Sequence, residues 1–282
     1  MSRVDLHIHS TASDGKLEPA DVVRGAAEKG LAYIALADHD TVSGIAPAQE
    51  AAKSFPKLKV IPGVEISTDT PDGEVHILGY FIDYNDPEFK AALERFRNSR
   101  LVRARGMVAK LDKLGIHIDW QRVEEIAGTS SIGRPHIAQA MLEKGYIASF
   151  KEAFTNYIGR DGPAYVEREK MTPAEAVAII VKAGGLAVLA HPFTAGEPEA
   201  LITELKPAGL AGIEAYYDNY SAEAIDQLVE LAKKHDLIAT GGSDYHGLEP
   251  TNETAIGGAE VPMESAERLI ALAKAKNPSL VF

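Results

Sequence analysis

The chain contains no cysteine among its 282 residues. This absence excludes disulfide bonds, thiolate nucleophiles, iron–sulfur clusters and cysteine-based zinc sites. No apolar run is long enough to span a bilayer, and the N-terminal residues lack the basic and then apolar pattern of a signal peptide. We therefore expect a cytoplasmic protein that makes no contact with a membrane.

Basic residues are also in the minority, because 29 lysines and arginines stand against 41 aspartates and glutamates, for a net charge of −12. Proteins that coat long nucleic acids neutralise phosphates with basic side chains, so this balance argues against that class. The sequence has no P-loop and no dinucleotide-type GxGxxG motif. What remains is a globular protein, 45% apolar and 25% charged.

Seven apolar runs predict β-strands, most of them continuous in the manner of parallel strands covered on both faces. They are residues 3–8, 32–37, 59–66, 74–82, 185–190, 212–217 and 237–241. Amphipathic stretches predict helices at 18–29, 43–54, 172–183, 198–206 and 221–235. This alternation predicts an α/β fold with a TIM-like barrel, and a doubly wound open sheet is the alternative.

One long stretch interrupts the alternation. It carries helical patterns at 87–114, 119–127, 134–144 and 149–158 and no convincing strand. We therefore predict a barrel domain formed by residues 1–86 and 171–282, with residues 87–170 as a helical insertion that caps the barrel mouth.

Six of the nine histidines stand in short motifs that carry acidic or glycine residues, and most of these motifs follow apolar runs. The motifs are VDLHIHS, LADHD, GVEIS, EVHILGY, LAHP and GGSDYH, with GVEIS contributing a glutamate instead of a histidine. In a strand, His7 and His9 point the same way. In TIM-like barrels the working residues gather at the carboxyl ends of the strands, where most of these motifs lie. Imidazole and carboxylate groups gathered there predict a site for several divalent metals.

Each motif alone has a plainer explanation. Asp14 lies in a turn sequence, His39 is followed by a loop, and His76 fits a hydrogen-bonded core histidine because it lies near the front of its predicted strand. The metal site is predicted from the set as a whole. Its members are His7, His9, Asp14, His39, Glu65, His76, His191, Asp244 and His246.

These residues resemble the ligand set of the polymerase and histidinol phosphatase (PHP) family, and all nine positions are filled. The resemblance covers roughly residues 1–85 and 172–260, and it implies a distorted (β/α)7 barrel with two or three divalent ions, manganese foremost, with iron and zinc as alternatives. It implies a first ion on His7, His9, Glu65 and Asp244. It implies a second ion on Glu65, His76 and His191, and a third on Asp14, His39 and His246.

Within the family, Asp14 and the wording LADHDT and GVEIS resemble a nucleotide-directed branch. Members of that branch act as 3′,5′-nucleoside bisphosphate phosphatases, and some act as 5′-to-3′ exoribonucleases. The segment SIGRPHIAQAM resembles a phosphate-binding segment of this branch, which implicates Arg134 and His136 in substrate binding. The chain departs from many relatives at YYDNYS, where Tyr220 stands in place of a histidine.

The resemblance implies a metal-dependent phosphoric ester hydrolase in which metal-activated hydroxide attacks phosphorus, with Glu65, Asp244 and His191 as catalytic residues. The expected substrate is small and phosphorylated, either a nucleotide or a short oligonucleotide. Two alternatives stay open: a phosphatase for a small amino-alcohol or sugar phosphate such as histidinol phosphate, and a non-catalytic metal-binding module.

Residues 95–113 of the insertion are basic within an acidic protein. The run has a single acid, Asp112, and its basic members are Arg95, Arg97, Arg100, Arg103, Arg105, Lys110 and Lys113. A solvated helix face explains such a run most simply. A rim that attracts phosphorylated substrates is the functional alternative.

Overall fold

The computed structural model describes residues 3–70, 73–128, 132–167, 171–194, 196–247 and 253–280. The chain divides into two compact units. The barrel unit comprises Met1–Ala92 and Met171–Phe282, and the helical unit comprises Leu93–Lys170. The division lies inside helix α3 (Pro87–Lys113), not at its first residue.

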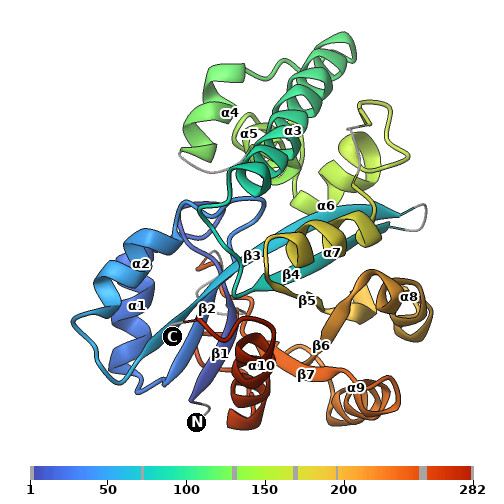
Figure 1. Ribbon diagram of the computed structural model, residues 1–282. Helices are drawn as coiled ribbons and strands as arrows, with labels where there is room; N and C mark the ends of the chain where they lie inside the picture. Colours follow the sequence, from blue (N-terminus) through green and yellow to red (C-terminus); the bar gives the residue numbers. More distant parts are fainter. Residues whose placement is uncertain are drawn as a thin grey trace. The chain divides into compact units, whose positions relative to one another are not determined.

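The seven predicted strands are present and form one sheet in which each strand pairs with the next along the chain. They are β1 (Val4–Ile8), β2 (Tyr33–Leu36), β3 (Lys59–Thr70), β4 (Gly73–Tyr80), β5 (Leu186–Leu189), β6 (Leu210–Tyr217) and β7 (Ile238–Gly242). Beyond the end of β7, the Asp244 amide donates to the His7 carbonyl and the His9 amide donates to the Tyr245 carbonyl. These bonds bring the two ends of the sheet together, so the barrel prediction is confirmed and the open-sheet alternative is wrong (Figure 1).

Strand β4 runs antiparallel to both of its neighbours, against the expectation of parallel strands. Only two residues separate β3 from β4, and a parallel connection needs a crossover of about a dozen residues or more. The turn-type sequence Thr70-Pro71-Asp72-Gly73 indicates such a short antiparallel connection. Because β4 is reversed, the front of β4 lies beside the back of β3, where His76 pairs with Ser67. This reversal explains how His76, near the first residue of its strand, lies beside side chains from the last residues of the other strands.

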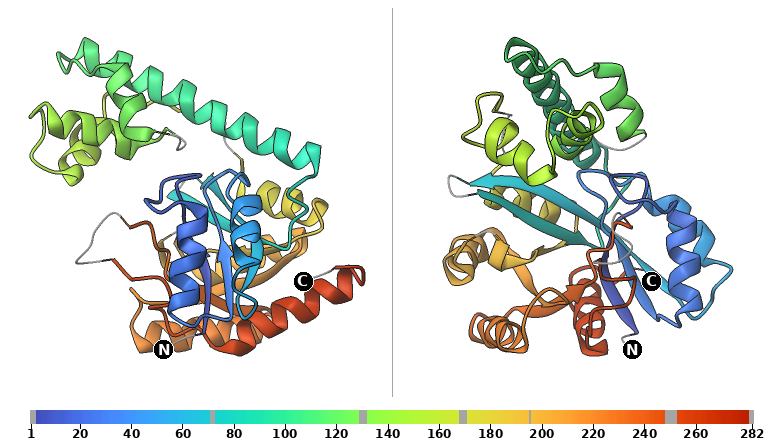
Figure 2. Two further views of the ribbon diagram at one scale, coloured as in Figure 1. Left: turned by 90° about the vertical axis from the view of Figure 1, so that its left-hand side faces the viewer. Right: turned by 180° about the vertical axis from the view of Figure 1, so that it is seen from behind.

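Helices pack against the outside of the strands (Figures 1 and 2). They are α1 (Pro19–Glu28), α2 (Ile45–Ala52), α7 (Pro173–Lys182), α8 (Pro198–Leu205), α9 (Ala222–Lys234) and α10 (Met263–Lys276). Proline opens α1 and α7, where a missing N–H leaves no hydrogen bond unmade. Helix α10 was not predicted. No helix in the described ranges is long and apolar enough to cross a membrane.

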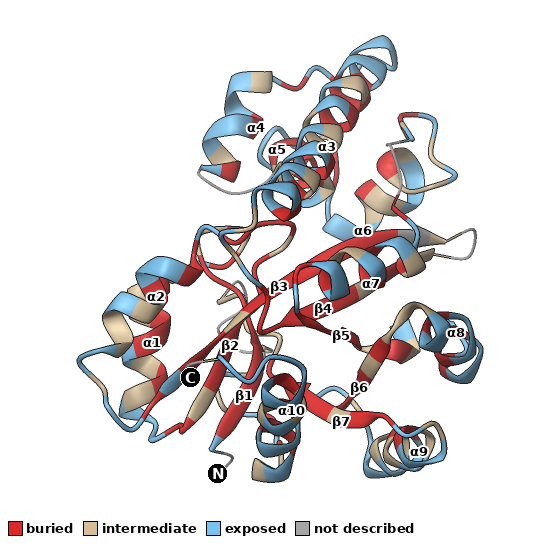
Figure 3. Cartoon of the chain, viewed as in Figure 1, coloured by how far each residue is buried: buried red, intermediate tan, exposed pale blue. Residues whose placement is uncertain are grey.

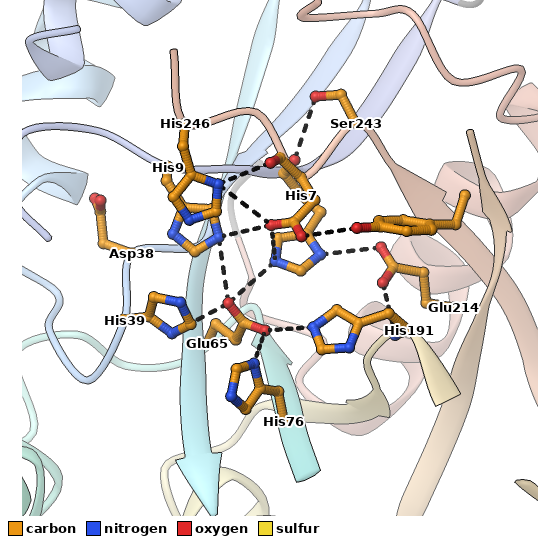
Figure 4. A network of polar contacts seen from close by, with 12 residues as sticks. His7, His9, Asp38, His39, Glu65, His76, His191, Glu214, Ser243 and His246 are labelled. Atoms are coloured by element: carbon orange, nitrogen blue, oxygen red, sulfur yellow. Dashed lines mark hydrogen bonds and ion pairs between the residues drawn. The ribbon is translucent and has the colours of Figure 1, made fainter. Parts of the chain in front are cut away.

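The barrel core follows from the alternation along β1. Val4 and Leu6 pack into one apolar cluster that also contains residues of α10, and Ile8 packs into a second cluster with residues of α1 and α2. Figure 3 displays these buried strands beneath helices whose outer faces are exposed. The intervening residues His7 and His9 are also buried, and their rings point toward the site described below (Figure 4).

The helical unit has its own core. Besides most of α3 it contains α4 (Trp120–Ala127), α5 (Arg134–Glu143) and α6 (Phe150–Ala153), which continues as one π-helical turn (Phe154–Ile158). Its buried side chains include Met107, Leu111, Val123, Ile137 and Met141. Trp120 packs against this core, and Asp119 caps α4 by accepting from the Gln121 amide.

Candidate metal centre

The structure gathers eight of the nine predicted ligands into three overlapping groups of potential metal-binding atoms, each group spanning at most 4.8 Å. The groups are His7, His9, Glu65 and Asp244; His39, Glu65 and His76; and His9, Asp14, His39 and His246. The ninth, His191, lies beside the second group (Figure 4). Side chains separated by more than 230 residues therefore share one site.

Glu65 lies at the centre of this site and is only 1% exposed. Its Oε2 atom is 3.2 Å from the nearest ring nitrogens of His7, His9 and His39. Its Oε1 atom is 2.8 Å from His76 Nδ1 and 3.1 Å from His191 Nε2. The two carboxylate oxygens therefore face two different sets of imidazoles, which is the arrangement a bridging ligand requires.

Asp244 completes the first group. Its Oδ1 atom lies 3.4 Å from His7 Nε2 and 3.1 Å from His9 Nε2. Asp244 adopts a φ of 51°, so the segment after β7 is not extended and the alternation of a strand does not continue through it. A turn at Asp244 brings both side chains to the site instead, and His246 Nδ1 hydrogen bonds to the Asp244 carbonyl.

Asp14 organises the third group. Its Oδ1 atom is 3.5 Å from His9 Nδ1 and 3.5 Å from His246 Nε2, and its Oδ2 atom is 3.8 Å from His39 Nε2. These contacts match the set that the resemblance implied for a third ion, with His9 added. The grouping differs from the implied one at the second ion, where His39 lies within reach of both Glu65 and His76.

The electrostatics of the site reflect densely packed opposite charges. Burial alone raises the pKa of Glu65, but the surrounding histidines, with His39 and His7 foremost, hold it well below its usual value. Burial lowers the pKa of His9, yet contacts with Asp244 and Glu65 raise it to about 10. Burial prevails at His39 and lowers its pKa to about 4. The ionised carboxylates of the site therefore hold protons on His7 and His9, whereas His39 is neutral.

The donor set fits divalent metal ions. Both ring nitrogens of His9 and Nε2 of His7 are fully buried and make no hydrogen bond, although carboxylate oxygens lie 3.1–3.5 Å away. A buried polar atom without a hydrogen bond is costly unless another partner satisfies it. Imidazole nitrogens and carboxylate oxygens suit manganese, iron and zinc alike. A cation in the first group would satisfy Nε2 of His7 and Nε2 of His9, and the remaining Nδ1 of His9 faces Asp14 of the third group.

Three side chains outside the predicted ligand set support the site. Glu214 in β6 is fully buried and contacts His7 and His191. Asp38 accepts from the Ser10 amide and from the Ser10 and Ser13 hydroxyls, which fixes the loop before Asp14. Tyr217 donates to Asp244. Glu214 carried the same signal as Glu65, namely a glutamate inside an apolar run.

Arg134 and His136 lie in the helical unit, at the start of α5. The Arg134 guanidinium stands 5.4 Å from the centre of the Phe154 ring. His136 Nδ1 accepts from the Gly133 amide at 3.0 Å, so this ring nitrogen caps the helix. Both side chains are partly exposed. Their role in binding substrate stays a prediction.

The basic run on α3 is not uniformly solvated. Arg103 is only 5% exposed, so the expectation of a solvated face is wrong at this position. Arg105 lies 4.8 Å from the Trp120 ring centre, and Lys110 donates to the Tyr165 carbonyl. Part of the run therefore stabilises the helical unit.

Similarities to known proteins extend over most of the chain. A model of the PHP domain family matches residues 5–159. A 3′,5′-nucleoside bisphosphate phosphatase from Chromobacterium violaceum is 36% identical over 258 residues, which cover 87% of this chain and 88% of that protein. A 5′-3′ exoribonuclease from Haemophilus influenzae is 35% identical over 248 residues, which cover 86% of this chain and 90% of that protein. The solved structure of a proposed metal-dependent phosphoesterase from Bifidobacterium adolescentis is 29% identical, with a TM-score of 0.82 and 95% coverage of both chains.

Proposed function

Because the chain belongs to the PHP domain family of metal-dependent phosphoesterases, we propose that it hydrolyses nucleotides, with 3′,5′-nucleoside bisphosphates as the foremost substrates and short 5′-phosphorylated RNA as a further one. The relatives are named as phosphatases and exoribonucleases, so the chain is a hydrolase and the non-catalytic alternative is set aside.

The environment of Glu65 is the observation that carries this proposal. Five histidines contact its two buried oxygens, three through Oε2 and two through Oε1. A single salt bridge would need one histidine, not five. A carboxylate with imidazoles on both sides is suited to hold two ions close together, which is how two-metal phosphoesterase sites are built.

The chain's residues then have separate tasks. His7, His9 and Asp244 would hold one ion with Glu65, and His76 and His191 would hold another, with Asp14, His39 and His246 around a third. Ions bound there would supply a Lewis acid for the phosphate oxygens and lower the pKa of water toward about 7. Arg134 would orient the phosphate through the planar guanidinium that matches phosphate oxygens. Glu65, Asp244 and His191 stay the proposed catalytic residues.

A substrate panel tests the proposed function. Purified protein loaded with manganese is given adenosine 3′,5′-bisphosphate, a short 5′-phosphorylated RNA and histidinol phosphate, and kcat/KM for phosphate or nucleotide release is measured. We expect the bisphosphate to be hydrolysed fastest and a chelator to stop the reaction. Faster hydrolysis of histidinol phosphate would favour the small-molecule alternative instead.

Substitution of Arg134 by alanine tests the substrate contact. Losing a hydrogen bond to a charged group costs about 1.5–3 kcal/mol, so we expect kcat/KM to fall about 10- to 150-fold, with KM raised and kcat lowered. The number of bound metals should not change. Steady-state kinetics and metal analysis of the same preparation measure both quantities.

Arg105→Ala is the matched control for this prediction. Arg105 belongs to the same unit and stacks on Trp120 as Arg134 stacks on Phe154. Its removal should leave kcat/KM within about twofold. Equal kinetics for Arg134→Ala and the unsubstituted protein would exclude Arg134 from substrate binding.

A further inference from the structure

Strand β6 differs from the other six strands of the barrel. Each of the others carries a predicted metal ligand or leads directly into one, whereas none of the nine lies on β6 (Leu210–Tyr217). Two polar side chains of β6 nevertheless contact the predicted ligands, and these are Glu214 and Tyr217. Strand β6 therefore supplies side chains that contact the predicted ligands, but it supplies none of the nine ligands itself.

Both carboxylate oxygens of Glu214 are used in this way. Oε1 lies 3.0 Å from His7 Nδ1, and Oε2 accepts from the His191 backbone amide at 2.8 Å. The side chain is 0% exposed, so an ionised carboxylate here needs such partners. Figure 4 shows Glu214 reaching both residues from the side opposite Glu65. The two partners of Glu214 lie on opposite sides of the proposed dimetal site, because His7 belongs to the first group and His191 lies beside the second.

A bulge in β6 allows Tyr217 to join Glu214 at the site. Glu214 pairs with Thr240 of β7 while Tyr216 pairs with Gly241, so β6 contains one extra residue at this point. In a regular strand, residues three apart point to opposite faces, and a bulge changes this alternation. The Tyr217 hydroxyl accordingly donates to Asp244 Oδ2 at 3.1 Å, which leaves Oδ1 directed at His7 and His9.

We propose that Glu214 is a positioning residue that sets the tautomer of His7 and the backbone of His191 for metal binding. Its Oε1 accepts the proton on His7 Nδ1, so that Nε2, 3.2 Å from Glu65 Oε2, is the nitrogen that gives up its proton to bind a metal. Its Oε2 secures the amide of His191, whose φ of 23° is one that side-chain-bearing residues rarely adopt. Carboxylates behind ligating histidines orient the ring and strengthen the ligand. The inference rests on the metal site of the proposed function and is independent of the substrate.

Substitution of Glu214 by glutamine tests it. The variant keeps the shape of the side chain, but its amide can donate to His7 Nδ1 and so favour the wrong tautomer. Titration calorimetry with Mn²⁺ should give an affinity about 10- to 100-fold weaker than that of the unsubstituted protein. Tyr80→Phe is the control, because it deletes a buried hydroxyl that donates to the Leu6 carbonyl and not to a predicted ligand. It should lower the thermal unfolding temperature without changing Mn²⁺ affinity.

The ¹⁵N spectrum of the unsubstituted protein loaded with diamagnetic Zn²⁺ gives a second test that needs no variant. We expect a protonated Nδ1 and a metal-bound Nε2 at His7, and the reverse assignment would overturn the proposal even if Glu214→Gln fails to fold. Equal Mn²⁺ affinity of Glu214→Gln and the unsubstituted protein would overturn it as well. If the unsubstituted protein itself binds no Mn²⁺, it is the proposed function that fails.

Discussion

Replacing Glu65 by glutamine is expected to remove two metal ions at once and to lower kcat/KM by at least about a hundredfold. Glutamine keeps the size of the side chain but carries no charge, and its amide nitrogen cannot act as an acceptor. The two sets of imidazoles that now face Oε1 and Oε2 would lose their common anion. Changing a residue that merely supports a metal ligand already costs about 10- to 100-fold, so losing a bridging ligand should cost more.

Metal analysis by mass spectrometry after dialysis measures the first effect, and steady-state kinetics measures the second. Asp14→Asn is the matched comparison, because Asp14 is a member of the third group alone and its loss should cost a single ion. Glu88→Gln, an exposed acid paired with Lys182, should cost none. Full metal content in Glu65→Gln would refute the bridge.

Metal affinity is expected to rise steeply with pH, by about a hundredfold per pH unit near neutrality. Burial lowers the pKa of His7 and His9, but the surrounding carboxylates outweigh it, so the pKa of His7 lies well above its ordinary value and that of His9 is about 10. A metal binds only the neutral ring, so about two protons must leave when the first group is filled. His39, with a pKa of about 4, is already neutral and releases none.

The sign of the effect follows from these raised pKa values. In the metal-free chain, the protonated histidines contribute stability that is complete below pH 6.5 and is lost as the pH rises through about 10. Metal affinity rises over the same pH range, because the protons that compete with the metal for His7 and His9 leave. Calorimetry in two buffers of different protonation enthalpy counts the protons released. An affinity that does not change between pH 7 and 9 would contradict the charge state described here.

Much of the fold was predictable from local pattern. Most of the seven strands are continuous apolar runs, and Gly30, Gly115 and Gly184, just after the ends of α1, α3 and α7, adopt the positive φ typical of such positions. The gathering of these side chains at one place was predictable, because polar residues directly after buried strands need partners there. His7 and His9 needed only the alternation of a strand to be placed on one face.

Other features depend on tertiary contacts that no local pattern encodes. His39 lies beside Glu65 because the segment after β2 runs parallel to β3, and His76 joins them because β4 pairs antiparallel with β3. The turn at Asp244 aligns it with His246 through a positive φ that spacing does not reveal. Glu214 was overlooked although it interrupts an apolar run, because its partners come from β1 and from the segment after β5.

We expect side chains on or after six strands of the barrel to hold divalent ions around Glu65. Anomalous diffraction from crystals grown with manganese tests it most directly. We predict at least two peaks, on either side of the Glu65 carboxylate, each about 2.0–2.3 Å from imidazole nitrogens or carboxylate oxygens of the named residues. A map with no peak among these side chains, or with manganese bound only elsewhere on the molecule, would contradict the account.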